Sequence, residues 1–157
     1  MTAASHEYTG GCQCGAVRFR AEGVGRASIC HCRMCQKAFG GFFGPLVTGL
    51  GIEWTRGSPK HFASSNKARR GFCAECGTPL TYEYDGGIEL AIGAFDDPAL
   101  VAPVLQVNPA DKLPFVDGLS SLPMRQPGDN ADADAFLAGI TSRQHPDHDT
   151  DEKEPAR

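Results

Sequence analysis

Three cysteines fall within six residues in the stretch Cys30-His31-Cys32-Arg33-Met34-Cys35. Sulfurs at such short spacings can converge on one ion from a single turn of the chain, whereas ordinary buried cysteines would be scattered through apolar runs. Zinc is the default metal for tetrahedral thiolate sites, and an iron–sulfur cluster is the alternative on ligand type alone. The stretch therefore predicts a metal-binding loop whose three thiolates leave one coordination position open.

Two further cysteine pairs flank this loop, and glycines adjoin both of them. They are Cys12-Gln13-Cys14 and Cys73-Ala74-Glu75-Cys76, so the seven cysteines divide into four plus three. The spacing allows two tetrads, either Cys32, Cys35, Cys73 and Cys76 or Cys12, Cys14, Cys73 and Cys76. The second is favoured because it leaves Cys30, Cys32 and Cys35 as one compact three-thiolate loop.

Composition limits the class of protein and its partners. A chain of 157 residues with 41% hydrophobic residues has the size of a single domain. The formal charge of −4 and the absence of a basic run exclude a nucleic-acid surface. No apolar stretch is long enough to span a membrane and the first residues lack the pattern of a signal peptide, so we expect a cytoplasmic protein with reduced thiols.

Local patterns predict a mainly β fold of short, mostly antiparallel strands. Alternating apolar and polar residues mark strands over 16–20 and 80–84, and Asp85-Gly86 predicts a hairpin between 80–84 and 88–92. Further strands are expected over 42–48, 51–55, 60–63 and 103–107, with short helices over 33–39 and 134–140. We expect residues 1–8 to form a flexible arm, 9–126 a domain stapled by two zinc sites, and 127–157 an acidic, disordered tail in which His145 and His148 are solvated.

The three cysteine motifs together resemble the glutathione-dependent formaldehyde-activating enzyme family, which also contains centromere protein V. They are Gly10-Gly11-Cys12-Gln13-Cys14-Gly15-Ala16-Val17-Arg18-Phe19, then Cys30-His31-Cys32-Arg33-Met34-Cys35-Gln36-Lys37, then Phe72-Cys73-Ala74-Glu75-Cys76-Gly77-Thr78-Pro79-Leu80. The resemblance covers about Tyr8 to Pro123. Because three separate motifs must coincide in order, it is highly specific for the family and much less specific for one reaction.

The resemblance implies an open, twisted, mostly antiparallel β arrangement with two zinc ions per chain. It assigns Cys12, Cys14, Cys73 and Cys76 to a structural site, and Cys30, Cys32 and Cys35 to a catalytic one. The implied activity is that of a carbon–sulfur lyase working in the synthetic direction, which joins glutathione to formaldehyde as S-(hydroxymethyl)glutathione. The implied partner is a small thiol, with glutathione as the first candidate.

Other side chains are weaker candidates for roles in this chemistry. His31 could move a proton, although a supporting or solvated role is the better expectation for a residue between two ligands. Arg33, Lys37, Arg69 and Arg70 could meet the carboxylates of glutathione, but each by itself is expected to be a surface charge. The chain departs from the family pattern at Gln106, in a strand where members often carry a histidine, and an amide cannot act as an acid or base.

Two functions of other classes compete with the lyase. A non-catalytic zinc module could bind a protein partner, and an open three-thiolate loop could act as a redox sensor because such sulfurs are readily oxidised. The short, non-basic start of the chain and its acidic balance argue against the chromatin-associated branch of the family. The sequence therefore favours the lyase over the other two.

Overall fold

The hairpin predicted around Asp85 and Gly86 lies within a large sheet. In the computed structural model, which describes residues 7–151, β6 (Pro79–Tyr84) pairs antiparallel with β7 (Gly87–Ala91). Gly86 takes a φ of 97°, a conformation that glycine adopts without steric cost. The hairpin prediction is confirmed.

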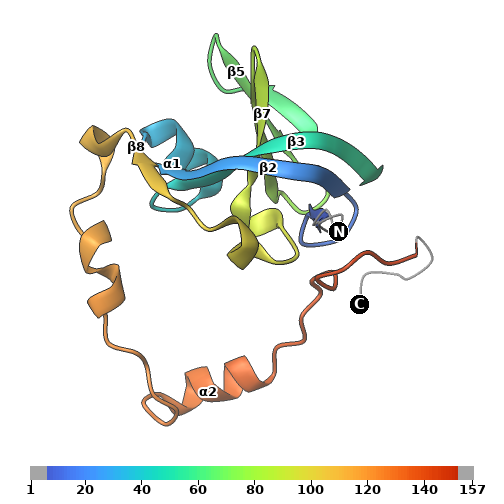
Figure 1. Ribbon diagram of the computed structural model, residues 1–157. Coiled ribbons are helices and arrows are strands. Elements are labelled where there is room, and N and C mark those ends of the chain that lie inside the picture. The colour runs from blue at the N-terminus through green and yellow to red at the C-terminus, as the bar shows by residue number, and fades with distance from the viewer. Residues whose placement is uncertain (1–6, 152–157) are drawn as a thin grey trace, which may run out of the picture.

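The described residues form eight strands in one sheet, so the prediction of a mainly β, mostly antiparallel fold is confirmed (Figure 1). The order across the sheet is β1-β2-β3-β7-β6-β5-β4, and β8 pairs parallel with β2. The remaining strands are β1 (Tyr8–Gly11), β2 (Arg18–Cys30), β3 (Gly44–Arg56), β4 (Lys60–Ala63), β5 (Ala68–Phe72) and β8 (Leu105–Val107).

Two strands are longer than the local pattern indicates. The two predicted strands over 42–48 and 51–55 fall in one strand, β3, which begins only at Gly44 and passes through Gly51 at a φ of 58°. Its partner β2 extends to Cys30, and their register shifts twice, which marks bulges in a strongly bent pair. β2 therefore connects the Cys12–Cys14 turn at its start to the three-cysteine loop at its end.

The core lies where β2, β3, β6 and β7 face the short turns after β7. Phe19, Val47, Leu80 and Leu90 are fully buried there. The Phe19 ring meets the Phe95 ring edge-on at 5.2 Å between centroids and the Trp54 ring at 6.0 Å. These contacts bury Phe19, which stands only a few residues from the first cysteine pair.

Helices are few and short. The predicted helix over 33–39 is confirmed as α1 (Arg33–Phe39), which ends at Gly40 with a φ of 60°. The other helix, α2, spans Ala131–Ala138, three residues earlier than expected at its start. Short 3₁₀ helices are η1 (Ile92–Ala94), η2 (Pro98–Val101), η3 (Pro109–Asp111) and η4 (Val116–Ser121). None of the helices in the described part has the length and apolarity needed to cross a membrane.

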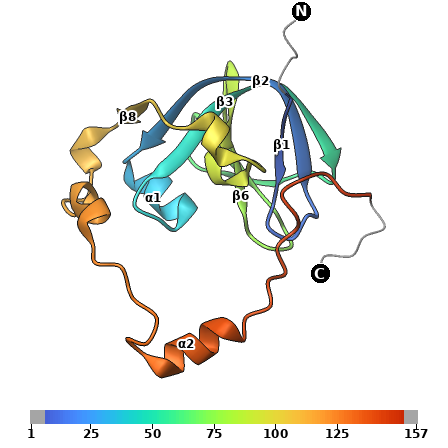
Figure 2. The same ribbon diagram turned by 60° about the horizontal axis from the view of Figure 1, so that its bottom comes forward.

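After β8 the chain leaves the sheet and later returns to it. Figures 1 and 2 show η4 and α2 on a long excursion away from the sheet, and then a final described segment that comes back beside β1. The predicted domain boundaries at residues 9 and 126 stay a prediction. Tyr8 already belongs to β1, and residues 127–151 include α2 and the returning segment.

Candidate metal centre

The first cysteine cluster joins two turns at one end of the molecule. Cys12 and Cys14 lie between β1 and β2, and Cys73 and Cys76 lie between β5 and β6. The four sulfurs all lie within 4.8 Å of one another, with 3.5 Å between Cys12 and Cys14 and 3.8 Å between Cys14 and Cys73. Sulfurs bound to a tetrahedral zinc ion at about 2.3 Å would be about 3.8 Å apart, so the cluster fits that ion.

The second cluster is built from one short segment. Cys30 is the last residue of β2, Cys32 caps the N-terminus of α1, and Cys35 is buried within α1. Their three sulfurs also lie within 4.8 Å of one another. The structure thus separates the cysteines into the four-plus-three division favoured above, and Cys32 and Cys35 do not join Cys73 and Cys76.

Each sulfur of the three-cysteine cluster accepts a hydrogen bond from nitrogen. Asn108 Nδ2 donates to Cys30 at 3.1 Å, the Cys35 amide donates to Cys32 at 3.4 Å, and Arg70 Nη2 donates to Cys35 at 3.2 Å. Donors on all three sulfurs suit thiolates, which accept hydrogen bonds and have no proton to give. The surroundings are therefore arranged for a set of charged sulfur ligands.

The thiol pKa values differ widely within each cluster. Burial raises the pKa of Cys12 to about 12, whereas hydrogen bonds from Thr78 outweigh burial and lower that of Cys76 to about 6. The three-cysteine cluster likewise contains one thiol with a raised pKa and one with a lowered pKa. Burial raises the pKa of Cys35 to about 12, while hydrogen bonds lower that of Cys30 in spite of its burial. Neighbouring thiolates oppose one another's ionisation, and a bound metal cation would relieve that repulsion.

Arg70 is not the surface charge that the sequence suggested. It is only 3% exposed, its Nε donates to Ser64 Oγ at 2.9 Å, and its guanidinium lies 4.8 Å over the centre of the Tyr82 ring. The adjacent Arg69 does match the expectation, with a 61% exposed side chain paired to Glu83. Alternation along β5 explains the difference, since successive side chains point to opposite faces of a strand.

His31 and Gln106 form a pair at the edge of the three-cysteine cluster. His31 is fully buried and its Nε2 donates to Gln106 Oε1 at 2.8 Å, while its Nδ1 has no partner among residues 7–151. The ring also meets Phe43 edge-on at 6.0 Å between centroids. Gln106 therefore fixes the orientation of His31, which agrees with a supporting role for that histidine.

Asn108 is the site residue that the sequence analysis missed. It follows β8 with a φ of 54°, the only positive φ of a non-glycine residue within 7–151. The dipeptide Asn108-Pro109 is a turn signal, and asparagine tolerates this conformation better than most residues. That signal marks the turn, but it cannot show that the turn brings the Asn108 amide to Cys30.

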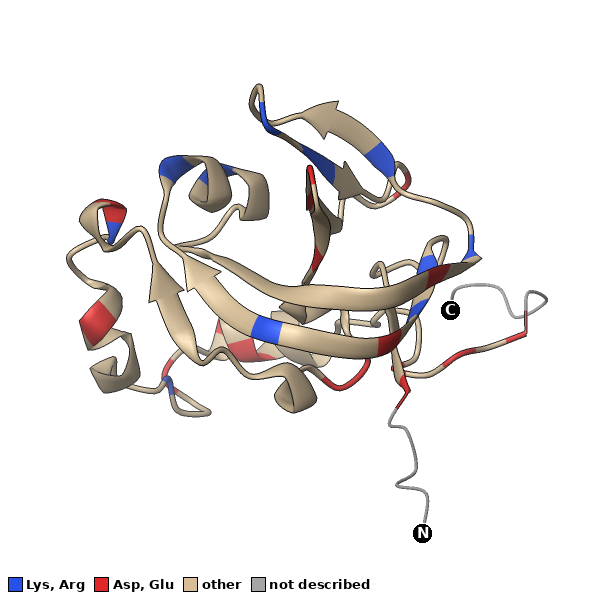
Figure 3. Cartoon of the chain, turned by 45° about the horizontal axis from the view of Figure 1, so that its top comes forward, with Lys and Arg blue, Asp and Glu red and all other residues tan. Residues whose placement is uncertain are grey.

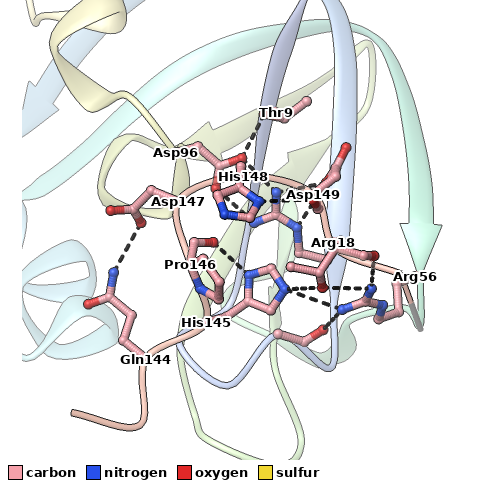
Figure 4. Close-up of polar contacts among 12 residues, drawn as sticks. Thr9, Arg18, Arg56, Asp96, Gln144, His145, Pro146, Asp147, His148 and Asp149 are labelled. Carbon is pink, nitrogen blue, oxygen red and sulfur yellow. Dashed lines mark hydrogen bonds and ion pairs between the residues drawn. The ribbon is translucent and has the colours of Figure 1, made fainter. Parts of the chain in front are cut away.

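The returning C-terminal segment, residues 144–150, packs against the turn of the four-cysteine cluster (Figure 4). The His145 amide donates to the Gln13 carbonyl at 2.7 Å, and the ring is so close to Gly15 that a Cβ there would lie 2.2 Å from it. His145 is 6% exposed, so the expectation of a solvated histidine is wrong. We call residues 144–150 the strap.

Charged groups hold the strap in place. Buried Arg18 pairs with Asp96 through Nη1 and Nη2 at 2.7 and 2.6 Å, and with Asp149 of the strap at 2.8 Å. Arg56 hydrogen-bonds the strap residue Thr150. Burial lowers the pKa of His145, and the charges of Arg18 and Arg56 lower it further. The bound strap therefore holds a neutral His145, and a pH below the ordinary pKa of histidine favours the released strap, whose histidine takes up a proton more readily.

Replacing His145 by alanine is expected to release the strap without unfolding the sheet. The substitution removes a buried ring together with its hydrogen bonds, and we expect it to lower the free energy that holds the strap on the sheet by about 1–2 kcal/mol. Amide hydrogen exchange at residue 145 should become fast in this variant. His148→Ala is the matched control because His148 is exposed; equal protection of residue 145 in both variants would contradict the strap contact.

Comparison with known proteins gives a family match over the sheet and both clusters. A family model described as glutathione-dependent formaldehyde-activating enzyme matches residues 7–109. No curated protein matches the sequence. A crystal structure of a Rhodobacter sphaeroides protein from a structural genomics programme is similar in fold, with a TM-score of 0.50 and 18% identity, over 63% of this chain and 99% of that one.

Proposed function

This chain belongs to the glutathione-dependent formaldehyde-activating enzyme family, and on that premise we propose that it is a zinc-dependent carbon–sulfur lyase acting on adducts of a small thiol with an aldehyde. The pair that names the family, glutathione and formaldehyde, is the first candidate for its substrates. The observation that carries the proposal is the three-cysteine cluster, in which each sulfur already accepts a hydrogen bond from nitrogen. Three protein ligands leave the fourth position of a tetrahedral ion to the substrate.

The reaction forms one carbon–sulfur bond and moves one proton. The thiol sulfur attacks the carbonyl carbon, the electron pair of the carbonyl goes to oxygen, and the proton lost by the thiol ends on that oxygen. Zinc bound by Cys30, Cys32 and Cys35 would supply a soft acid that keeps the substrate sulfur as thiolate, the nucleophilic form. No nucleophile from the protein is required, so positioning of the two substrates is the main contribution of the chain.

Arg70 favours an anionic fourth ligand in this arrangement. Three thiolates and a dication carry a net charge of −1, and a substrate thiolate would add a further negative charge. Arginine stays protonated in proteins, and Arg70 is buried against Cys35. Its positive charge therefore offsets part of the charge that the substrate brings.

The proposal is tested by exchange NMR on glutathione mixed with formaldehyde. We expect the wild-type protein to speed formation and breakdown of the adduct at least tenfold over the Cys32→Ser variant, because that variant lacks one of the three sulfurs. The variant is the proper blank, since the uncatalysed reaction is appreciable. Equal rates combined with no glutathione binding in calorimetry would reject the lyase and favour the protein-interaction module.

A further inference from the structure

The strap is joined to the rest of the molecule by a stretch of chain that is not bonded to the sheet. Within residues 7–151, no hydrogen bond or ion pair connects residues 116–143 to the sheet or to the cysteine turns, and those around α2 stay within that stretch. The family model ends at residue 109, so the strap also lies outside the matched part of the chain. Its docking therefore depends on contacts that the strap makes itself.

Opposite charges direct the strap to the sheet. Figure 3 shows acidic positions along the last described stretch of the chain, and the sheet supplies two arginines. Buried Arg18 donates to Asp149 Oδ1 from Nε at 3.1 Å and from Nη2 at 2.8 Å. Arg56 Nη2 donates to the Thr150 hydroxyl at 3.2 Å, while its Nη1 donates to the Gly15 carbonyl at 3.2 Å. Arg56 thus ties the strap to the turn that carries Cys12 and Cys14.

His145 gives the strap a fixed shape over that turn. The ring donates from Nδ1 to the Pro146 carbonyl at 2.7 Å and accepts at Nε2 from the Thr150 hydroxyl at 2.9 Å. Both ring nitrogens are therefore used within the strap itself. The ring is buried against Gly15, where any larger residue would collide with it. The strap docks as a preformed unit that fills the space above the turn.

Gln13 carries the contact from the strap into the four-cysteine cluster. Its carbonyl accepts from the His145 amide at 2.7 Å, and its own amide donates to Thr78 Oγ1 at 3.0 Å. The Thr78 oxygen in turn lies 3.1 Å from Cys76 Sγ. A cavity of about 130 Å³ lies between the strap and the turn, and Cys12 contributes to its lining. The strap is therefore linked to both halves of the cluster.

These links oppose the movement by which a closed tetrad loses its metal. The four sulfurs come from two separate turns, so an ion can leave when the Cys12–Cys14 turn moves away from the Cys73–Cys76 turn. Gln13 and Gly15 flank Cys14, and the docked strap holds both of them. Buried groups of a folded protein become reachable through such local openings, whose frequency falls as the contacts that close them increase.

We propose that the strap is a C-terminal lock on the four-cysteine cluster. While it is docked, the Cys12–Cys14 turn stays against its partner turn, and a metal ion held by the four sulfurs is retained. Undocking frees the turn and leaves the sheet folded. The chain thereby controls metal retention through a segment that supplies none of the four sulfurs, and this control is separate from the proposed lyase activity, which uses the three-cysteine cluster.

The test follows zinc release from the full-length protein to an excess of a coloured chelator. The slow phase belongs to the four-cysteine cluster and is identified as the phase that remains in Cys32→Ser. We expect it to be about tenfold faster in His145→Ala and about fivefold faster in Asp149→Asn, which acts at the other end of the strap. Asp147→Asn is the matched control, because among the described residues Asp147 hydrogen-bonds only Gln144 of the strap itself, and its rate should be unchanged.

Amide hydrogen exchange at residue 145, measured on the same samples, reports how far each variant opens the strap. The slow phase should become faster in proportion to that opening. The lock is overturned if the slow phase is unchanged while residue 145 exchanges faster, or if neither His145→Ala nor Asp149→Asn speeds that exchange. Faster release in His145→Ala alone would also overturn it, since the ring and not the docked segment would then protect the turn.

A second readout does not depend on bound metal. Cys12 is 3% exposed, so its alkylation by iodoacetamide in metal-free protein requires the turn to open. Mass spectrometry should find faster modification of Cys12 in His145→Ala and Asp149→Asn than in the wild type or Asp147→Asn. Equal rates of modification in all four proteins would overturn the lock.

Discussion

The Cys73→Ser variant is expected to lose its fold. Cys73 is fully buried, and its sulfur lies 3.8 Å from that of Cys14, which is 59 residues away in the chain. Structural zinc contributes roughly 10–16 kcal/mol to folding in small zinc domains. Since a whole domain is stable by only about 5–15 kcal/mol, removal of one tetrad ligand should leave insoluble or molten protein. Circular dichroism and soluble yield measure this outcome.

Cys32→Ser is the matched control, and it should stay folded with one zinc ion. Cys32 caps α1 by accepting a hydrogen bond from the Cys35 amide, and serine is at least as good a cap. The substitution therefore removes a ligand of the three-cysteine cluster while it keeps the local structure. Comparable unfolding of both variants would contradict a structural role that belongs to the four-cysteine cluster alone.

Mild chelation is expected to remove one of two zinc ions and leave the fold intact. The four-cysteine cluster ties two distant turns together, and its Cys12 and Cys73 are buried. The three-cysteine cluster comes from six consecutive residues and needs an outside ligand to complete a tetrahedron, so it should yield its metal first. Elemental analysis should give close to two zinc ions per chain, falling toward one while the circular dichroism spectrum is unchanged.

Two other results would contradict this order of release. A single zinc ion that leaves only on unfolding would mean that the three-cysteine cluster does not hold metal on its own. Simultaneous loss of both ions with the fold would mean that the clusters are coupled. Addition of glutathione before chelation provides a further check, because a thiol in the open position should slow removal of the first ion without affecting the second.

Features that depend on neighbouring residues were predictable from the sequence. Helix α1 over Arg33–Phe39 and strand β4 over Lys60–Ala63 have the predicted bounds, and the hairpin at Asp85 and Gly86 forms as expected. Turn residues and side-chain alternation depend only on residues a few positions apart, so a short stretch of sequence is enough to predict these elements. The compactness of Cys30, Cys32 and Cys35 likewise favoured the division of cysteines that the structure has.

The tertiary structure alone decided which side chains meet across the chain. Arg70 reaches Cys35 from 35 residues away, Asn108 reaches Cys30 from 78 residues away, and the His145 ring of the returning strap lies against Gly15. The patterns of residues around each of these positions are those of a surface strand, a turn and a solvated tail. The roles of Arg70 and Asn108 follow from the pairing of β5 with β6 and of β8 with β2, because sheet register between distant segments determines which of two adjacent arginines is buried and which faces water.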